Sequence, residues 1–214
     1  MKYFLLLISI IVFQLTAQDN THWYIFAGGG SGEVEVVGHD RSQMVSDLFS
    51  KSGIGVSNTS GGQDDGTDVF HIGVGYILNE NFSIEGAYHD FGDTSGSFSA
   101  QLDSDASIIN GKLDSEYQAL SLSLVGQYPI IERLAFTGQL GIHYWEHEVN
   151  ISGSNPTASI NEDDTDDGID FIYGFGLKFN INDNFQIMAG WNRFYGIEDE
   201  DGIDTKYLSL IYKF

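Results

Sequence analysis

Apolar and polar residues alternate with a period of two along much of the chain, which is the pattern of a β-strand with two different faces. The clearest case is residues 203–214, where Leu208, Leu210, Tyr212 and Phe214 share one face and the other face is mixed. The same alternation predicts strands at 22–30, 68–78, 82–91, 116–128, 133–145, 169–180 and 185–195. The sequence therefore predicts eight strands.

Short and long connections alternate strictly between these predicted strands. The turns around 79–81, 129–132 and 181–184 are short, whereas the other connections are long and polar. Such alternation is typical of an outer-membrane barrel, with short periplasmic turns and long extracellular loops. In lipid an open sheet would leave backbone N–H and C=O groups unpaired, so the sheet must close. The predicted fold is all-β, an eight-stranded antiparallel up-and-down transmembrane β-barrel.

The two faces of the strands fit lipid outside and a polar lumen inside. The predicted outward positions are apolar: Phe70, Ile72, Val74, Tyr76, Ile84, Tyr88, Leu120, Leu122, Leu124, Tyr128, Leu134, Phe136, Leu140, Ile142, Tyr144, Phe171, Tyr173, Phe175, Leu177, Ile187 and Trp191. The predicted inward positions are small, polar or charged: His71, Glu85, His89, Ser121, Ser123, Thr137, Gln139, His143, Gly174, Gly176 and Asn192. A soluble eight-stranded barrel would place its apolar face inside instead.

Composition and the first residues agree with export to a membrane. Residues 1–17 combine a positive start, an apolar run too short to span a bilayer and a small residue at the end, which predicts a signal peptide followed by a barrel domain at 18–214. The chain has no Cys, which excludes disulfides and thiolate metal sites. Its net charge of -22 would repel a phosphate backbone, so no nucleic-acid partner is expected.

The long connections contain segments of their own regular pattern. Residues 33–37, 98–102 and 149–151 alternate like strands and predict a sheet that continues beyond the membrane and leaves pairing edges for a partner chain. The alternative is acidic loops without fixed structure. After Ser42, the apolar residues Met44, Val45, Leu48 and Phe49 predict one side of a short helix.

Polar residues on the inward face suggest three chemistries for the lumen. The first is a metal site made by His71, His89 and His143, although histidines of a polar lumen also bond to neighbours or water. Another is a nucleophile at Ser121 or Ser123, but no His-x-Ser pairing typical of lipase barrels is present. The third is a set of ion pairs in the lower lumen among Glu85, Arg133, Lys178 and Lys213. Eight strands leave an interior filled by side chains, which favours structural packing over an aqueous pore.

Acidic residues cluster before three predicted strands, within repeated Asp-Gly segments. Turn chemistry explains the Gly and one Asp of each segment. The clustering of additional carboxylates predicts weak binding of calcium or magnesium. The candidate ligands are Asp163, Asp167, Asp170, Asp201 and Asp204. No cofactor is predicted.

Four segments together resemble the OmpA-like transmembrane domain: THWYIFAGGG, IEGAYHDFG, SLVGQYPI and the terminal YLSLIYKF. The resemblance covers nearly the whole mature chain and implies a monomeric eight-stranded barrel in the outer membrane of a Gram-negative bacterium. It also implies that Leu208, Leu210, Tyr212 and Phe214 form the signal read by the barrel-assembly machinery. Glu85 matches the interior carboxylate of the family, whereas Val125 and Met188 stand where its interior cations are expected. The peptidoglycan-binding domain of full-length OmpA is missing, and the long loops resemble the OmpX and opacity-type branch, in which a protruding sheet contacts other surfaces.

The expected function is therefore structural, or a surface interaction made through the long acidic extracellular loops, without catalysis. The expected partners are outer-membrane lipid, lipopolysaccharide, the barrel-assembly machinery and an external protein or surface. A narrow channel for small solutes or ions is the alternative, and a lipid-modifying enzyme is the less favoured one.

Overall fold

The computed structural model describes residues 22–35, 45–46, 49–50, 53–63, 66–155, 159–196 and 202–214. These residues form nine strands: β1 (Trp23–Glu35), β2 (Val56–Gln63), β3 (Gly66–Ile77), β4 (Phe82–Leu102), β5 (Ile108–Ile131), β6 (Leu134–Ser154), β7 (Ser159–Asn180), β8 (Phe185–Tyr195) and β9 (Gly202–Lys213). The predicted signal peptide lies outside the described residues. No helix in the described part of the chain is long and apolar enough to cross a membrane.

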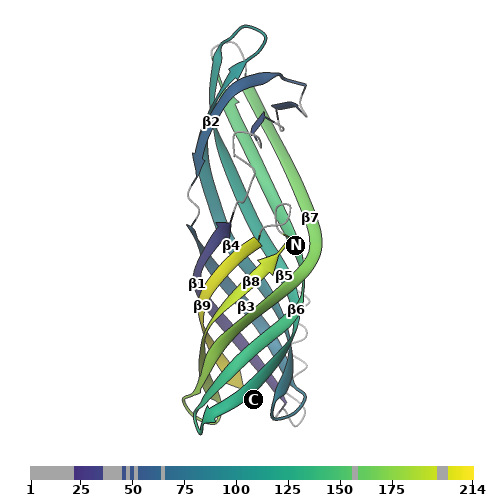
Figure 1. The fold of residues 1–214 in the computed structure, drawn as a ribbon, viewed down its shortest axis with the longest axis vertical. Coiled ribbons are helices and arrows are strands. Elements are labelled where there is room, and N and C mark those ends of the chain that lie inside the picture. The colour runs from purple at the N-terminus through teal and green to yellow at the C-terminus, as the bar shows by residue number, and fades with distance from the viewer. Residues whose placement is uncertain are drawn as a thin grey trace.

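Eight of the nine strands close into a ring, as the sequence predicts. Every neighbouring pair is antiparallel, and the ring closes where β1 pairs with β9, from Tyr24 opposite Lys213 to Glu35 opposite Gly202. The short turns and the carboxyl terminus lie together at the lower end of the barrel in Figure 1. The ninth strand, β2, stands outside the ring and pairs with the upper part of β4. It falls within a segment that the sequence assigns to a loop.

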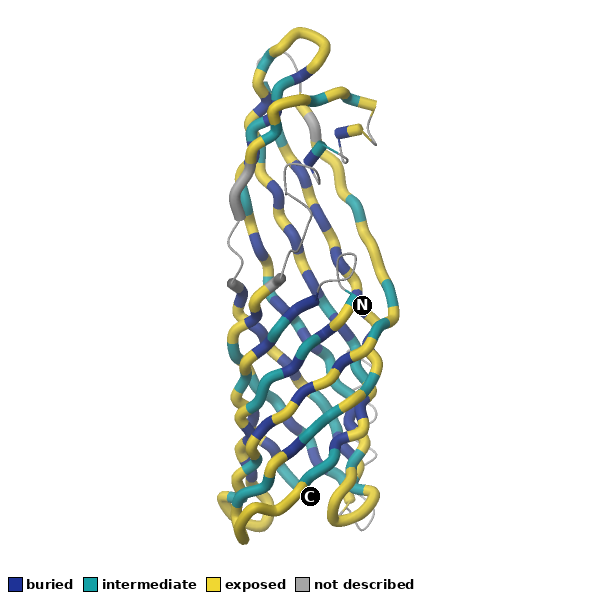
Figure 2. Tube along the Cα trace, in the orientation of Figure 1, coloured by how far each residue is buried: buried dark blue, intermediate teal, exposed yellow. Residues whose placement is uncertain are grey.

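The lipid-facing surface is the one that the alternation predicts. Large apolar side chains such as Leu122, Leu140 and Phe175 remain more than half exposed, although they lie in the middle of long, fully paired strands. Figure 2 shows the resulting alternation of exposed and buried residues along every strand of the lower barrel. Apolar residues remain on this surface because the bilayer, rather than water, surrounds them.

Four strands continue far beyond the barrel, which corrects the predicted strand ends. The segments 92–115 and 146–168 are largely strand rather than loop, since β4 pairs with β5 up to Gln101 opposite Ile108 and β6 pairs with β7 up to Ser154 opposite Ser159. Together with β2 they form a five-stranded wall, which we call the extracellular sheet (Figure 1). The strand-like segments predicted at 98–102 and 149–151 are thereby confirmed.

The inside-outside pattern reverses where these strands leave the membrane. On β6 the outward Ile142 and Tyr144 are followed by Glu146 and Glu148, while the inward side chains above His147 are the apolar Val149 and Ile151. The reversal follows from the solvent, because lipid surrounds the lower barrel and water surrounds the extracellular sheet. The predicted strands therefore ended where the apolar-outward pattern stopped, although the backbone ladder continues.

A small core lies against the inner face of the extracellular sheet. It contains Phe98, Ala100, Leu102, Ile109, Leu113, Val149 and Ile151, and it is covered by Val45 and Phe49 from helical residues between β1 and β2. The Phe49 and Phe98 rings meet edge to face with their centroids 5.8 Å apart. The predicted apolar side of a helix is thus confirmed at Val45 and Phe49, while Met44 and Leu48 lie outside the described residues.

A β-bulge in β4 separates the barrel from the extracellular sheet. The register shifts between Asp90 and Asp93, and Gly92 between them has a φ of +70°. Its N–H donates a 2.8 Å hydrogen bond to the Asp90 carboxylate. Glycine suits this position because positive φ is strained for other residues. The bulge lies where β4 parts from β3 and begins to run toward β2.

Candidate functional site

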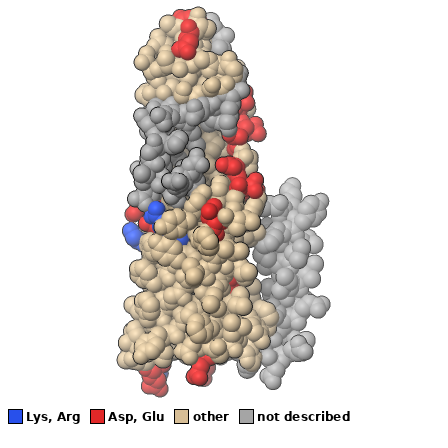
Figure 3. All heavy atoms as spheres, turned by 45° about the vertical axis from the view of Figure 1, so that its right-hand side comes forward, with Lys and Arg blue, Asp and Glu red and all other residues tan. Residues whose placement is uncertain are grey.

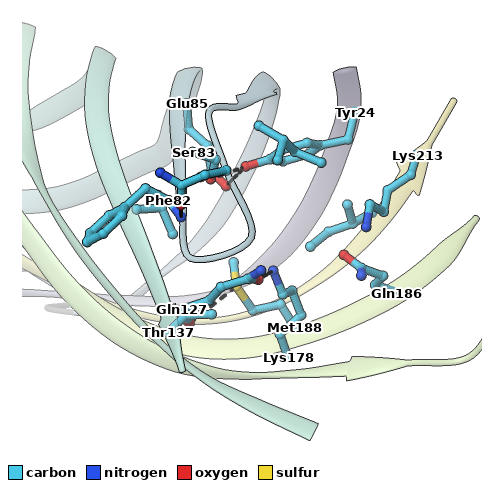
Figure 4. A pocket seen from close by; sticks show the side chains of 14 residues that line it. Tyr24, Phe82, Ser83, Glu85, Gln127, Thr137, Lys178, Gln186, Met188 and Lys213 are labelled. Atoms are coloured by element: carbon cyan, nitrogen blue, oxygen red, sulfur yellow. Dashed lines mark hydrogen bonds between the residues drawn. The ribbon is translucent and has the colours of Figure 1, made fainter. Parts of the chain in front are cut away.

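The lower lumen is organised around Glu85 of β4, as the inward alternation predicts. Its carboxylate is buried and accepts a 2.5 Å hydrogen bond from the Tyr24 hydroxyl of β1. The Ser83 hydroxyl lies 2.8 Å from the same phenolic oxygen. The Tyr24 ring crosses the lumen over Gly75 of β3, where any Cβ would collide with it. Figure 4 shows Tyr24 reaching across to Glu85 and Ser83.

Two of the three predicted cations share this region with Glu85. Lys178 and Lys213 line the same cavity of about 30 Å³, which fits about two water molecules. The Lys178 ammonium donates to the Gln127 side chain, and Val125 and Met188 fill the neighbouring wall. Arg133 corrects the prediction, because it is exposed in the turn between β5 and β6 and does not reach the lumen. A turn residue follows no strand alternation, so its side chain was assigned by a pattern that does not apply there.

The three inward histidines are buried in the middle of the lumen, each with a separate partner. His71 Nε2 lies 2.6 Å from Ser209 Oγ, His89 Nε2 lies 2.9 Å from Ser121 Oγ, and His143 Nε2 donates to a backbone carbonyl. Within the described ranges, no group of three His, Asp or Glu side chains is arranged to hold a metal ion. Two Ser–His pairs therefore exist, but no carboxylate bonds to either imidazole in the described contacts.

An apolar cluster closes the lumen above the histidines; we call it the lumen plug. It consists of Val69, Phe91, Tyr117, Ala119, Trp145, Ile172, Phe194 and Ile203, contributed by seven of the eight barrel strands. Phe91, Ile172, Phe194 and Ile203 are completely buried. The His89 ring packs against both Phe91 and Phe194. The plug thus separates a polar lower lumen from the extracellular sheet.

The outer face of the extracellular sheet carries rows of carboxylates. Glu116 lies opposite Asp93 on one side and Glu148 on the other, so three acidic residues stand side by side across β4, β5 and β6. Glu146 likewise faces Asp167 of β7. Figure 3 shows acidic side chains along the upper wall, above a broad surface with few charges. Like charges placed directly opposite destabilise a sheet, so this face is not arranged for stability alone.

The upper part of β7 forms an edge of the extracellular sheet. Residues 159–171 pair with β6, whereas the pairing of β7 with β8 begins only at Ile172 opposite Phe194. No other described strand pairs with this segment. It carries six acidic residues, Glu162, Asp163, Asp164, Asp166, Asp167 and Asp170. The sequence analysis expected pairing edges at 33–37, 98–102 and 149–151, whereas the edge in the structure lies on β7, mostly within a segment predicted as a loop.

The predicted calcium ligands are dispersed rather than gathered. Asp163 and Asp167 lie on one face of the extended β7, Asp170 accepts a 2.9 Å bond from Trp145 Nε1, and Asp204 pairs with Arg193 at 3.1 Å. Asp201 lies outside the described residues. A strand spreads alternate carboxylates along its length, whereas a calcium loop wraps them around one point.

The whole chain matches one family model over residues 4–214, that of the outer membrane protein beta-barrel domain. The chain belongs to this family. Membership agrees with the closed ring of amphipathic strands and places the protein in the outer membrane of a Gram-negative bacterium. No functionally curated protein matches the chain in sequence.

Solved structures of similar barrels share the fold of this family member at low sequence identity. Ail, the attachment invasion locus protein of Yersinia pestis, is 19% identical with a TM-score of 0.51, and the match covers 91% of this chain and 99% of Ail. Neisserial surface protein A is 13% identical with a TM-score of 0.50, covering 90% of this chain and 97% of that one. One structure of Ail contains the heparin analogue sucrose octasulfate.

The final strand of this family member occupies the seam of the barrel. Leu208 and Leu210 face lipid, and the Phe214 N–H donates to the Trp23 carbonyl at 3.2 Å. The Tyr212 ring packs between the rings of Phe185 and Phe214 at centroid distances of 5.1 and 5.3 Å. The predicted assembly residues therefore form one continuous apolar strip beside the first strand.

Two features of the site were missed from the sequence. Tyr24 was not recognised as the partner of Glu85, and the lumen plug was not anticipated. A signal for the plug exists, because the inward positions of β4 and β8 change from His89 and Asn192 to Phe91 and Phe194. Each of these apolar residues was assigned to its own strand, without being recognised as a member of one layer.

Proposed function

We propose that the protein acts at the cell surface through its extracellular sheet, with the barrel as a rigid anchor. The observation that carries the proposal is the five-stranded wall of β2 and β4 to β7, which rises above a barrel whose other strands end at the membrane (Figure 1). Its inner face is packed on β4 to β6, its outer face carries exposed carboxylates, and the upper part of β7 pairs with β6 alone among the described strands. An open edge and a charged face are the features by which sheets recognise partners.

The outer membrane supplies the remaining partners of this proposal. Lipid and lipopolysaccharide surround the apolar band, and the barrel-assembly machinery reads the terminal strand that ends in Phe214. The barrel works as a monomer, since the lipid-facing residues form a uniform apolar surface that needs only the bilayer as its partner. The acidic rows on the outer face suit a cationic partner and oppose binding of a sulfated ligand such as the one found with Ail.

A channel and an enzyme are both less well supported by the geometry. The lumen plug places completely buried Phe91, Ile172, Phe194 and Ile203 across the path that a solute would follow. The Ser–His pairs lie beneath that plug, where the barrel wall encloses them, and a nucleophile needs a route for its substrate. We therefore assign the protein a non-catalytic, non-conducting role.

Removing the extracellular sheet while keeping the barrel tests the proposal. Residues 95–114 and 148–165 would each be replaced by an Asn-Gly turn, which joins residues that are opposite each other in the register. Attachment of nanodiscs carrying either protein to cell-derived and protein-coated surfaces would be measured by interferometry. We expect the intact protein alone to attach. Equal attachment of a correctly folded shortened barrel would disprove a surface role for the sheet.

A further inference from the structure

We propose that the upper edge of β7 binds a cationic, extended polypeptide segment, which adds to the extracellular sheet as a further strand. This inference names the partner chemistry for the surface role proposed above and rests on it. It is carried by two independent properties of residues 159–171, the geometry of the edge and its charge.

The geometry of the edge is that of an acceptor strand. Residues 159–171 continue the register with β6 from Ser154 opposite Ser159 without a bulge or shift. They contain no proline, so no backbone N–H is missing along the edge, and only at its lower end does Gly196 lie against Asp170. At about 3.3 Å per residue, these 13 residues give an edge about 40 Å long. Natural sheets commonly protect such edges with bulges, prolines or charges, and this edge has neither bulge nor proline but a set of charges that are all acidic, which still admits a strand of opposite charge.

The charge of the edge determines which strand it accepts. Asp163 and Asp167 project on the outer face, and Asp164 and Asp166 on the other face, so carboxylates accompany either face of an incoming strand. The nearest outer residues on β6 are Glu146 opposite Asp167 and Glu148 opposite Thr165. A second copy would bring six further acidic residues to the same edge and is repelled. A strand that places Lys or Arg opposite Asp163 and Asp167 instead gains favourable cross-strand pairs there.

The cations of this chain lie away from the β7 edge. On β8 and β9, the outward cations Arg193 and Lys206 are paired with Asp204 and Glu33 at 3.1 and 3.4 Å, lower than the edge. On the outer face of the extracellular sheet, Lys112 of β5 is the one cation among the described residues. Asp163 and Asp167 of β7 are therefore exposed carboxylates on a face with few cations of its own.

The test uses the full folded protein in nanodiscs and peptides of about twelve residues, the length of the edge. The probe peptide alternates lysine with threonine and valine. Its control has the same sequence with alternate backbone amides methylated, which keeps the charge but removes half of the donors. We expect the probe to bind more than about tenfold tighter than the methylated peptide, because several strand hydrogen bonds are lost in the latter. Binding should weaken as salt increases, and backbone amides of 159–171 should become protected from hydrogen exchange.

Two matched double variants separate the edge from the acidic face. The first variant, Asp163→Asn with Asp167→Asn, removes two charges from the edge strand β7. The second, Glu116→Gln with Glu148→Gln, removes two charges from β5 and β6, which lie away from the edge. We expect the first pair to weaken binding clearly more than the second. Equal binding of the probe and its methylated control, or equal effects of the two double variants, would mean that a cation binds the face and not the edge, and the inference would be wrong.

Complete failure of the probe to bind would also reject this inference. The surface role itself is judged separately by the attachment of the shortened barrel. If attachment needs the extracellular sheet while the cationic peptide does not bind, the proposed function stands and the partner chemistry assigned here is wrong.

Discussion

Phe91 of β4 and Phe194 of β8 meet edge to face across the lumen, with ring centroids 4.8 Å apart and an interplanar angle of 81°. They come from strands on opposite sides of the ring, so their contact spans the interior rather than one wall. Both side chains are completely buried. The contact closes the barrel by packing, without any ion pair.

Opening this contact should convert the barrel into a conducting pore. In the double variant Phe91→Ala with Phe194→Ala, the lost ring volume would join the polar lumen below to the extracellular side. We expect single-channel conductance in planar bilayers for the variant and a silent wild-type protein. Phe70→Ala with Phe175→Ala removes two rings from the lipid face instead and should remain silent. A folded lumen variant without conductance would show that other members of the plug suffice to seal it.

Removing the Tyr24 hydroxyl should destabilise the barrel through Glu85. Tyr24→Phe keeps the ring over Gly75 but deprives the buried carboxylate of its 2.5 Å donor. An unsatisfied buried group costs about 1–3 kcal/mol, which urea unfolding in lipid vesicles would measure. Tyr128→Phe, at an exposed position, is the control and should have little effect. Combining Tyr24→Phe with Glu85→Gln should give less than the sum of the two single losses.

A charge introduced on the lipid-facing surface should lower the free energy of unfolding, most strongly near the middle of the bilayer. Leu122 points outward between Gly86 and Ile142, so Leu122→Arg should lower the unfolding free energy by about 2–4 kcal/mol. Ser154→Arg, at the tip of the extracellular sheet, places the same charge in water and should be tolerated. Comparable stability of the two variants would contradict the assigned position of the bilayer.

Reversing one charge in the acidic row should stabilise the extracellular sheet. Glu116→Lys would exchange two repulsive cross-strand neighbours, Asp93 and Glu148, for two attractive ones. We expect slower hydrogen exchange of β4 and β6 amides in the sheet at low salt, and a smaller difference at high salt. A Glu116→Gln variant should lie between the two proteins. Unchanged exchange at low salt would mean that solvent already screens the row.

The terminal strand should control assembly more than final stability. Tyr212→Ser with Phe214→Ser removes two ring contacts at the seam while leaving the backbone pairing with β1 available. In cells, we expect less of the folded, heat-modifiable form on gels. Refolding of the same variant from urea into detergent provides the comparison, since no assembly machinery acts there. An equal defect in both settings would indicate a packing role and no recognition signal.

The sequence by itself determined the barrel, because the bilayer imposes a rule that each strand obeys locally. Lipid requires an apolar residue at every second position, so Leu208 and Leu210, or Leu122 and Leu124, reveal both the strand and its outward face. The strand 185–195 was predicted with the observed ends of β8. Interior residues such as His71, Glu85 and Asn192 followed from the same alternation.

The tertiary structure decided what that local rule does not reach. Above the membrane, water replaces lipid and the apolar positions of β4 to β6 move to the inner face, so the strand ends were underestimated. The partner of Glu85 and the lumen plug depend on side chains from distant strands that meet across the barrel. The alternation within one strand does not predict which side chains of other strands it contacts. Arg133 lies in a turn, where neither face of a strand exists. The open edge of β7 likewise appears only when β8 is seen to stop short of it, because pairing is a property of two strands and not of one.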